Sequence, residues 1–191
     1  MLSIKNYSKH YKNFDIENLS LDIPDGTVVG LIGENGAGKS TIIKSILGVV
    51  HSDSGHILFN GTEISKISKK ERQQISFVLD DTGLPMELNL TMLCNVLSCI
   101  YDKWDAAKFS ELIRRFSLPD KKALKEFSKG MKMKAAIAVA LSYDSRLLIL
   151  DEPTSGLDPV VRDEMLQMIY DYNKDGNRAV LLSSHITTDL E

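Results

Sequence analysis

The sequence predicts an α/β fold, with a mostly parallel β-sheet, an N-terminal antiparallel β part and an inserted helical subdomain. Three observations support this prediction. Short apolar runs alternate with segments of helical periodicity, which is the pattern of βαβ units. The N-terminal part carries alternating strand patterns separated by turn signals. A helical block at residues 84–142 then interrupts the alternation, as an inserted subdomain would.

The N-terminal elements are predicted to be strands and one helix. Residues 2–6 alternate in polarity and predict an edge strand, whereas the apolar run at residues 27–32 favours a strand covered on both faces. Residues 40–47 have helical periodicity, with Gly48 as a stop signal. Further strands are predicted at residues 16–23, before the turn signal at 24–26, and at residues 55–59 and 61–64, as a hairpin across Asn60-Gly61.

The rest of the chain alternates buried strands with helices. Residues 88–116 are amphipathic and predicted to be helical. Ser128 can cap a helix over residues 128–141, whose interior is strongly apolar. The remaining predicted elements are strands at residues 75–79, 147–150 and 179–182 and a helix at residues 160–172.

Composition limits the classes of protein that fit. The 191 residues suggest one domain, and 43% hydrophobic with 26% charged residues is an ordinary globular balance. A net charge of −3 lacks the basic footprint of a nucleic-acid binder, so we expect no nucleic-acid partner. The longest apolar run, residues 135–141, is far shorter than the about 20 residues that span a bilayer. We expect a soluble, intracellular protein, with Cys94 and Cys99 buried and reduced.

A glycine-rich loop follows the apolar run at residues 27–32. It fits the pattern G-x-x-x-x-G-K-[ST] and opens the predicted helix, which is the context that a phosphate-binding loop of P-loop NTPases requires. Glycines let backbone N–H groups turn toward phosphate oxygens, the lysine reaches the β- and γ-phosphates, and the serine hydroxyl binds Mg²⁺. The predicted ATP-binding residues here are Gly33, Glu34, Asn35, Gly36, Ala37, Gly38, Lys39, Ser40 and Thr41.

Two carboxylates end the predicted strand at residues 147–150. Asp151 fits the acid that holds Mg²⁺, directly or through water. Glu152 lies one residue beyond and could polarise a water molecule for attack on the γ-phosphate. An acidic pair that only caps the next helix is the alternative, and the phosphate-binding loop upstream argues against it.

Three further segments resemble motifs of the ATP-binding cassette (ABC) ATPases. Ser128-Lys129-Gly130-Met131 resembles the family's signature motif, in an S-x-G-M form common among bacterial exporters. Residues 155–158, with Asp158, resemble the D-loop, and residues 183–185 resemble the switch-histidine segment that ends in His185. The order and spacing of the motifs match across essentially the whole chain. The resemblance implies one ABC ATPase domain, with a core of residues 1–83 and 143–191 and a helical subdomain of residues 84–142.

The family mechanism implies two copies of the domain packed head to tail, most simply a homodimer, with two ATP molecules between them. The signature residues of one copy would contact the ATP of the other, since a helix start presents N–H groups to phosphate. Asp158 would lie at the dimer contact. His185 would hold the γ-phosphate and the attacking water. ATP and Mg²⁺ are the implied cofactors.

An aromatic residue normally stacks on the adenine in this family. Tyr11 lies near the position where the family places that residue, while Tyr7 and Phe14 compete for the role and a core aromatic is the plain alternative. One departure from the family pattern occurs at Asp80, which stands where a glutamine is usual. Asp80 can still bind Mg²⁺ as a hard oxygen donor, so we expect a tighter metal dependence and altered coupling to the membrane subunit, with ATP binding retained.

The resemblance implies the ATPase subunit of a membrane transporter, with an integral membrane permease as partner and a place at the cytoplasmic face of the membrane. The signature form favours export of a peptide, drug or antibiotic-like substrate. A soluble ABC ATPase acting on DNA or the ribosome, and a small-molecule P-loop kinase, are the alternatives. The apolar residues Leu84, Leu88, Leu90 and Met92 near Asp80 would either form a docking groove or belong to the core. The chain ends soon after His185, so we expect a truncated C-terminus whose last helix is residues 187–191.

Overall fold

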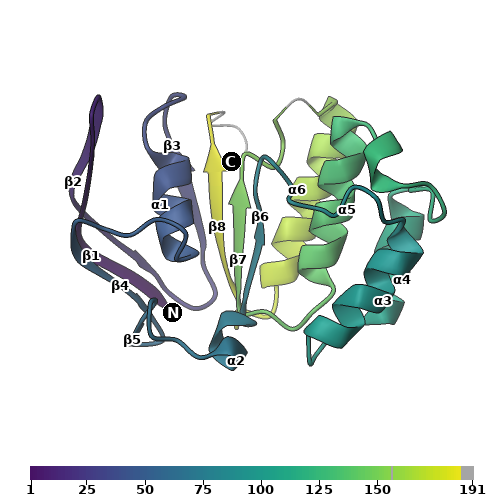
Figure 1. The fold of residues 1–191 in the computed structure, drawn as a ribbon, viewed down its shortest axis with the longest axis horizontal. Coiled ribbons are helices and arrows are strands. Elements are labelled where there is room, and N and C mark those ends of the chain that lie inside the picture. The colour runs from purple at the N-terminus through teal and green to yellow at the C-terminus, as the bar shows by residue number, and fades with distance from the viewer. Residues whose placement is uncertain (156, 186–191) are drawn as a thin grey trace.

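The computed structural model describes residues 1–155 and 157–185 and contains two four-stranded sheets with helices around them (Figure 1). One sheet is antiparallel and has the strand order β2-β1-β4-β5. The other sheet is parallel and has the order β3-β8-β7-β6. This arrangement confirms the predicted α/β class with its N-terminal antiparallel part.

The antiparallel sheet is built from the N-terminal hairpins. Its strands are β1 (Leu2–Tyr11), β2 (Phe14–Ile23), β4 (Ser54–Phe59) and β5 (Thr62–Glu63). The prediction of an edge strand at residues 2–6 was wrong, because β1 pairs with β2 on one side and β4 on the other. Alternating polarity reports which face is buried and says nothing about neighbouring strands. The predicted hairpin turn is confirmed by the left-handed φ angles of Asn60 (50°) and Gly61 (82°), as a type I′ turn requires.

The parallel sheet separates two hydrophobic clusters. Its strands are β3 (Val28–Ile32), β8 (Ala179–Ser184), β7 (Leu147–Asp151) and β6 (Ile75–Val78). In β7 every residue is buried, and successive side chains enter opposite clusters. Leu148 and Leu150 join the cluster formed with the helical block, whereas Leu147 and Ile149 join the cluster beneath the antiparallel sheet.

Strand β3 differs from its prediction. We expected the run at residues 27–32 to be covered on both faces, but Val28 and Ile32 are 45% and 55% exposed. The reason is that β3 lies at the edge of the described parallel sheet, with β8 as its one partner. The run of apolar residues therefore predicted the strand correctly, but the side chains of β3 are less buried than the run suggested.

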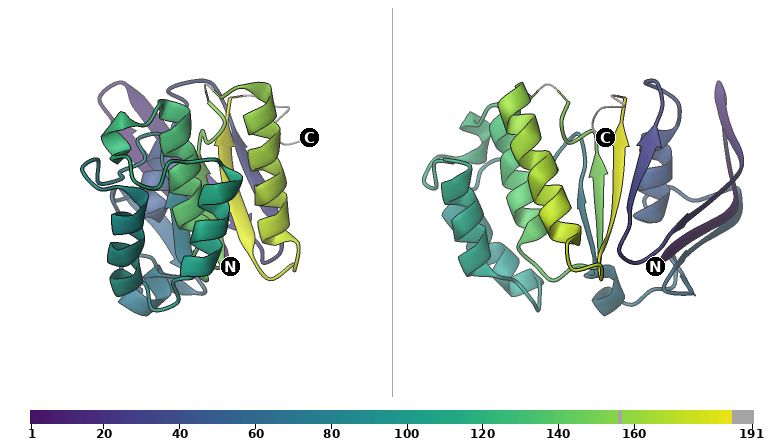
Figure 2. Two further views of the ribbon diagram at one scale, coloured as in Figure 1. Left: turned by 90° about the vertical axis from the view of Figure 1, so that its right-hand side faces the viewer. Right: turned by 180° about the vertical axis from the view of Figure 1, so that it is seen from behind.

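Three helices outside the helical block lie beside the strands. Helix α1 (Lys39–Ile46) contacts β7 from the side of the antiparallel sheet, and α6 (Pro159–Asn173) contacts β8 from the opposite face (Figure 2). The short α2 (Lys69–Arg72) precedes β6. In the described part of the chain, no helix combines the length and the apolar character needed to cross a bilayer. The predicted helix at residues 187–191 lies outside the described residues.

The helical block contains α3 (Leu90–Ile100), α4 (Ala106–Arg115), a short 3-10 helix (Leu124–Glu126) and α5 (Lys129–Leu141). The predicted helical stretch at residues 88–116 is two helices, because Asp105 caps a new helix through its side chain, which accepts a hydrogen bond from the Lys108 N–H. Leu90 is buried in this block and Met92 is exposed, so Leu90 belongs to the core. Both cysteines are free, but Cys94 is only partly buried and Cys99 is exposed, so the predicted burial of the two was wrong.

Candidate nucleotide-binding site

The loop between β3 and α1 has a backbone that only glycine adopts easily. Gly36 and Gly38 have φ angles of 87° and 93°, in the left-handed region. A Cβ atom on Gly38 would lie 2.6 Å from Cζ of Phe14, so this position has no room for a side chain. No side chain caps α1 at Gly38. The first N–H groups of α1 therefore remain available to an anion held by the loop.

Lys39 is held at the centre of this loop. The residue is 8% exposed, and its Nζ donates hydrogen bonds to the carbonyl oxygens of Gly33 (2.6 Å) and Glu34 (3.1 Å). The same Nζ lies 3.2 Å from Oε1 of Glu152. A buried ammonium group requires such partners, because burial without them is costly. The result is a cation fixed where the loop and the end of β7 meet.

The two carboxylates at the end of β7 lie in different environments. Asp151 is 4% exposed, and its Oδ1 accepts a hydrogen bond of 2.7 Å from the Ser183 hydroxyl. Glu152 has a left-handed φ of 52°, which turns its side chain toward the loop. The N–H of Glu152 donates to Oγ of Ser183 (3.0 Å), so this one serine fixes both acidic residues. This role of Ser183 was not predicted from the sequence motifs. It depends on the register of the parallel strands, which pairs Asp151 with Ser183.

His185 completes the polar chain at this edge of the sheet. Its Nδ1 lies 2.5 Å from Oε2 of Glu152, whose other carboxylate oxygen faces Lys39. Three residues that are far apart in the sequence thus form one connected group, from Lys39 through Glu152 to His185. A cation, a carboxylate and an imidazole in this arrangement can bind an anion and hold a proton acceptor beside it.

A cavity of about 550 Å³ opens beside this group; Lys39 and Glu152 line it, whereas the predicted site residue His185 does not. Its size is in the range of small-molecule sites. The residues that line it are Tyr11, Phe14, Asn35, Gly36, Gly38, Lys39, Ser40, Thr41, Lys44, Val50, Asp80, Asp151 and Glu152. The predicted loop residues Gly33, Glu34 and Ala37 shape the loop without lining the cavity.

The three aromatic residues considered for stacking on the adenine lie in different places. Tyr7 is 1% exposed, and its hydroxyl lies 2.7 Å from Oγ of Ser45, so Tyr7 belongs to the core. Tyr11 and Phe14 face each other as the last pair of the β1–β2 ladder, and both line the cavity. An aromatic pair at the open end of a phosphate-binding cavity offers a stacking surface to a base.

The donor set of the cavity fits a magnesium nucleotide. Ser40, Asp80 and Asp151 supply hard oxygen atoms to its wall, and the loop supplies N–H groups and the Lys39 ammonium. Magnesium is commonly held by one or two carboxylates together with phosphate oxygens, and this wall offers both carboxylates.

Residues 16–155 match the family model described as ABC transporter. The chain belongs to this family. It is 36% identical over 194 residues to the lantibiotic transport ATP-binding protein SrtF of Streptococcus pyogenes, covering 100% of this chain and 82% of that protein. It is 33% identical over 192 residues to the ABC transporter ATP-binding protein YtrB of Bacillus subtilis (strain 168), covering 100% of this chain and 65% of YtrB. A solved structure of an ATP-binding subunit of an ABC transporter superimposes with a TM-score of 0.88 at 32% identity, covering 98% of this chain and 80% of that one.

In this ABC ATP-binding domain the residues of the predicted signature start helix α5. Ser128 caps the helix, and its hydroxyl accepts a 3.3 Å hydrogen bond from the Met131 N–H. Gly130 lies against the Leu157 side chain, where an added Cβ would be 3.3 Å from Cδ2. These residues do not line the cavity described above.

Asp80 and Asp158 have contacts of their own. Oδ1 of Asp80 lies 2.9 Å from Nζ of Lys129, so the residue at the usual glutamine position pairs with the signature of the same ABC domain. Asp158 caps α6 through its side chain, which accepts a 3.1 Å hydrogen bond from the Val161 N–H. Gly156 of the predicted D-loop lies outside the described residues.

Proposed function

We propose that this domain binds MgATP in the cavity over the phosphate-binding loop and hydrolyses it to power an exporter of peptide, drug or antibiotic-like compounds. The observation that carries the proposal is the connected group of Lys39, Glu152 and His185, with Asp151 beside it. The family membership supports ATPase activity, and the lantibiotic transport named for SrtF supports the substrate class.

The residues have separate proposed roles. Lys39 and the loop N–H groups would bind the phosphates, while Tyr11 and Phe14 would contact the base. Ser40, Asp80 and Asp151 would hold Mg²⁺, which when bound screens the phosphate charge. Glu152 would accept a proton from the attacking water at its carboxylate, and His185 would orient that carboxylate through the 2.5 Å contact.

The dimer is part of the proposal. Ser128, Lys129, Gly130 and Met131 would contact the nucleotide of a second copy, with Asp158 at the same contact. The side chain of Lys129 is 61% exposed, so it is accessible to a partner's phosphate. We assign residues 1–83 and 143–191 to the catalytic core and 84–142 to the helical subdomain. The two parts share one hydrophobic cluster, because α5 packs on β6.

A groove beside β6 would receive the permease. Its volume is about 500 Å³, and α1, β6 and the end of α3 contribute to its walls. Val49, Phe77 and Ile100 line it and are 68%, 47% and 54% exposed. Exposed apolar side chains that share one groove are typical of protein contacts. An apolar helix of a membrane subunit, at the cytoplasmic face of the membrane, would fit this groove.

Two experiments test the proposed function. The purified domain should hydrolyse ATP in the presence of Mg²⁺, and Glu152→Gln should retain ATP binding, lose turnover and accumulate as an ATP-bound dimer. A Glu152→Gln variant that turns over ATP at the parent rate would refute the assigned base.

Purification from detergent-solubilised native membranes should yield a polytopic membrane protein with the domain. Recovery of ribosomal or DNA-bound material with no membrane protein would contradict the transporter assignment.

A further inference from the structure

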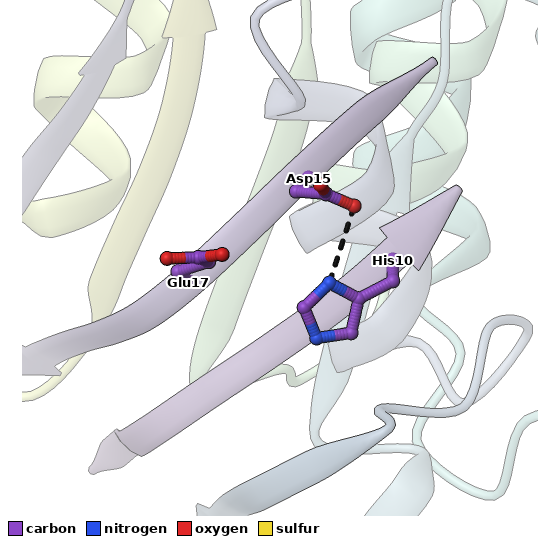
Figure 3. A group of neighbouring side chains, drawn as sticks. All are labelled: His10, Asp15 and Glu17. Atoms are coloured by element: carbon purple, nitrogen blue, oxygen red, sulfur yellow. Dashed lines mark hydrogen bonds and ion pairs between the residues drawn. The ribbon is translucent and has the colours of Figure 1, made fainter. Parts of the chain in front are cut away.

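A second group of metal-binding side chains lies on the β1–β2 hairpin, away from the nucleotide cavity. Figure 3 shows His10 on β1 with Asp15 and Glu17 on β2, all three on one face of the ladder. One ligand atom from each residue lies within 4.8 Å of the others. His10 is directly paired with Asp15 in the strand register, and Nδ1 of the imidazole is 3.1 Å from Oδ1 of Asp15.

This group is separate from the nucleotide site. Neighbouring residues of a strand point to opposite faces, so His10 and Asp15 lie on the face opposite Tyr11 and Phe14. The aromatic pair lines the nucleotide cavity, and none of the three metal-binding candidates does. The inference therefore does not rest on the proposed ATPase function.

The electrostatics of the group favour a cation. Asp15 and Glu17 carry two negative charges, and within residues 1–155 and 157–185 neither has an ion pair with a lysine or arginine. The adjacent Lys9 is turned to the other face, where it forms a 2.7 Å ion pair with Asp53. Among the described residues, the one ion-pair partner of Asp15 is the His10 imidazole, and Glu17 forms no ion pair.

We propose that His10, Asp15 and Glu17 form a binding site for a divalent transition metal of the Zn²⁺ class. One imidazole nitrogen and two carboxylate oxygens are a ligand set that zinc accepts, with water in the fourth position. Ligands bound to one tetrahedral zinc ion are about 3.3 Å apart, as follows from bond lengths near 2.0 Å. Nδ1 of His10 and Oδ1 of Asp15, which are hydrogen-bonded at 3.1 Å, are already about this far apart. One ligand atom of Glu17 lies within 4.8 Å of a ligand atom of each of the other two residues.

The chain supplies a matched control. His56 on β4 and Glu63 on β5 form the same kind of cross-strand pair, with Nδ1 3.2 Å from Oε2. This pair is not part of a three-ligand group in the described residues. The comparison isolates the third ligand, because a histidine–carboxylate pair is present in both places.

The test is calorimetric titration of the nucleotide-free domain with Zn²⁺. We expect one site in the parent protein and in His56→Ala. Loss of an outer-shell partner alone costs about 10- to 100-fold in metal affinity, so His10→Ala and Glu17→Gln should each weaken Zn²⁺ binding at least that much. Equal Zn²⁺ affinity in the parent, His10→Ala and Glu17→Gln would overturn the proposal, as would a loss of affinity in His56→Ala.

A second measurement, by NMR spectroscopy, identifies the histidine that binds Zn²⁺ in the parent protein. One equivalent of Zn²⁺ should shift the ¹⁵N resonances of the His10 ring and leave those of His51, His56 and His185 in place. Shifts at His185 would indicate that Zn²⁺ binds at the nucleotide site beside Glu152. If no histidine resonance shifted, an imidazole ligand would be excluded. Either result contradicts the assignment without requiring any variant to fold.

Discussion

Ser183→Ala tests whether one hydroxyl fixes the acidic end of β7. The Ser183 hydroxyl donates to the buried Asp151 carboxylate at 2.7 Å and accepts from the Glu152 N–H at 3.0 Å. A hydrogen bond to a charged group contributes about 1.5–3 kcal/mol and a neutral one about 1 kcal/mol, so the substitution should lower the free energy of unfolding by about 2.5–4 kcal/mol. Denaturant titration of the parent and the variant measures this difference.

The substitution should also slow ATP turnover, because it frees both acidic residues to move. If the looser positioning raises the activation free energy of hydrolysis by about 1.4 kcal/mol, the rate falls roughly tenfold. Ser142→Ala is the matched control, since this buried serine donates only to the Ala138 carbonyl, far from the cavity. A Ser183→Ala variant that is no less stable than Ser142→Ala, with the parent ATPase rate, would refute the reasoning.

Three further predictions concern the cavity wall. Lys39→Ala removes the ammonium that would bind phosphate, so nucleotide affinity should fall about 10- to 100-fold in a fluorescence titration; unchanged affinity would exclude this loop as the phosphate site. Gly38→Ala places a Cβ 2.6 Å from Phe14 and strains a φ of 93°, whereas Gly61→Ala has a similar φ of 82° and open space. Gly38→Ala should therefore lose more stability and bind nucleotide more weakly than Gly61→Ala, and equal effects would show that the Phe14 contact is unimportant. Asp80→Gln breaks an exposed ion pair with Lys129, which should change stability by less than about 1 kcal/mol but shift the Mg²⁺ dependence of ATPase activity. Superimposable Mg²⁺ titrations of the parent and Asp80→Gln would contradict a metal-binding role for Asp80.

The sequence predicted those parts of the site that depend on local spacing. The phosphate-binding loop follows a strand and opens a helix, and this order is visible in one dimension around Lys39. The neighbours of β1 and the exposed edge of β3 depend on which strands pair, and polarity patterns contain no such information. The boundary between helices α3 and α4 was not predicted, because a single capping residue, Asp105, divides an otherwise continuous amphipathic stretch.

Residues that act across strands were the hardest to find. Ser183 meets Asp151 only through the β7–β8 register, and His10 meets Asp15 only through the β1–β2 register. Each of these residues is unremarkable in its own segment. Knowledge of strand pairing would have revealed both groups.

The two-sided burial of β7 has a consequence for how its position along the sheet is specified. A slip by one residue would exchange the side chains between two clusters that are both apolar, so hydrophobic burial alone discriminates weakly between the two alignments. Polar contacts at the ends of the strand discriminate strongly. Ser145 before β7 lies 2.8 Å from the Ser76 hydroxyl, and Asp151 at its far end accepts from Ser183. A slipped strand would leave a buried carboxylate without its donor, so the contacts that prepare the acidic residues for chemistry also determine the alignment of the central strand.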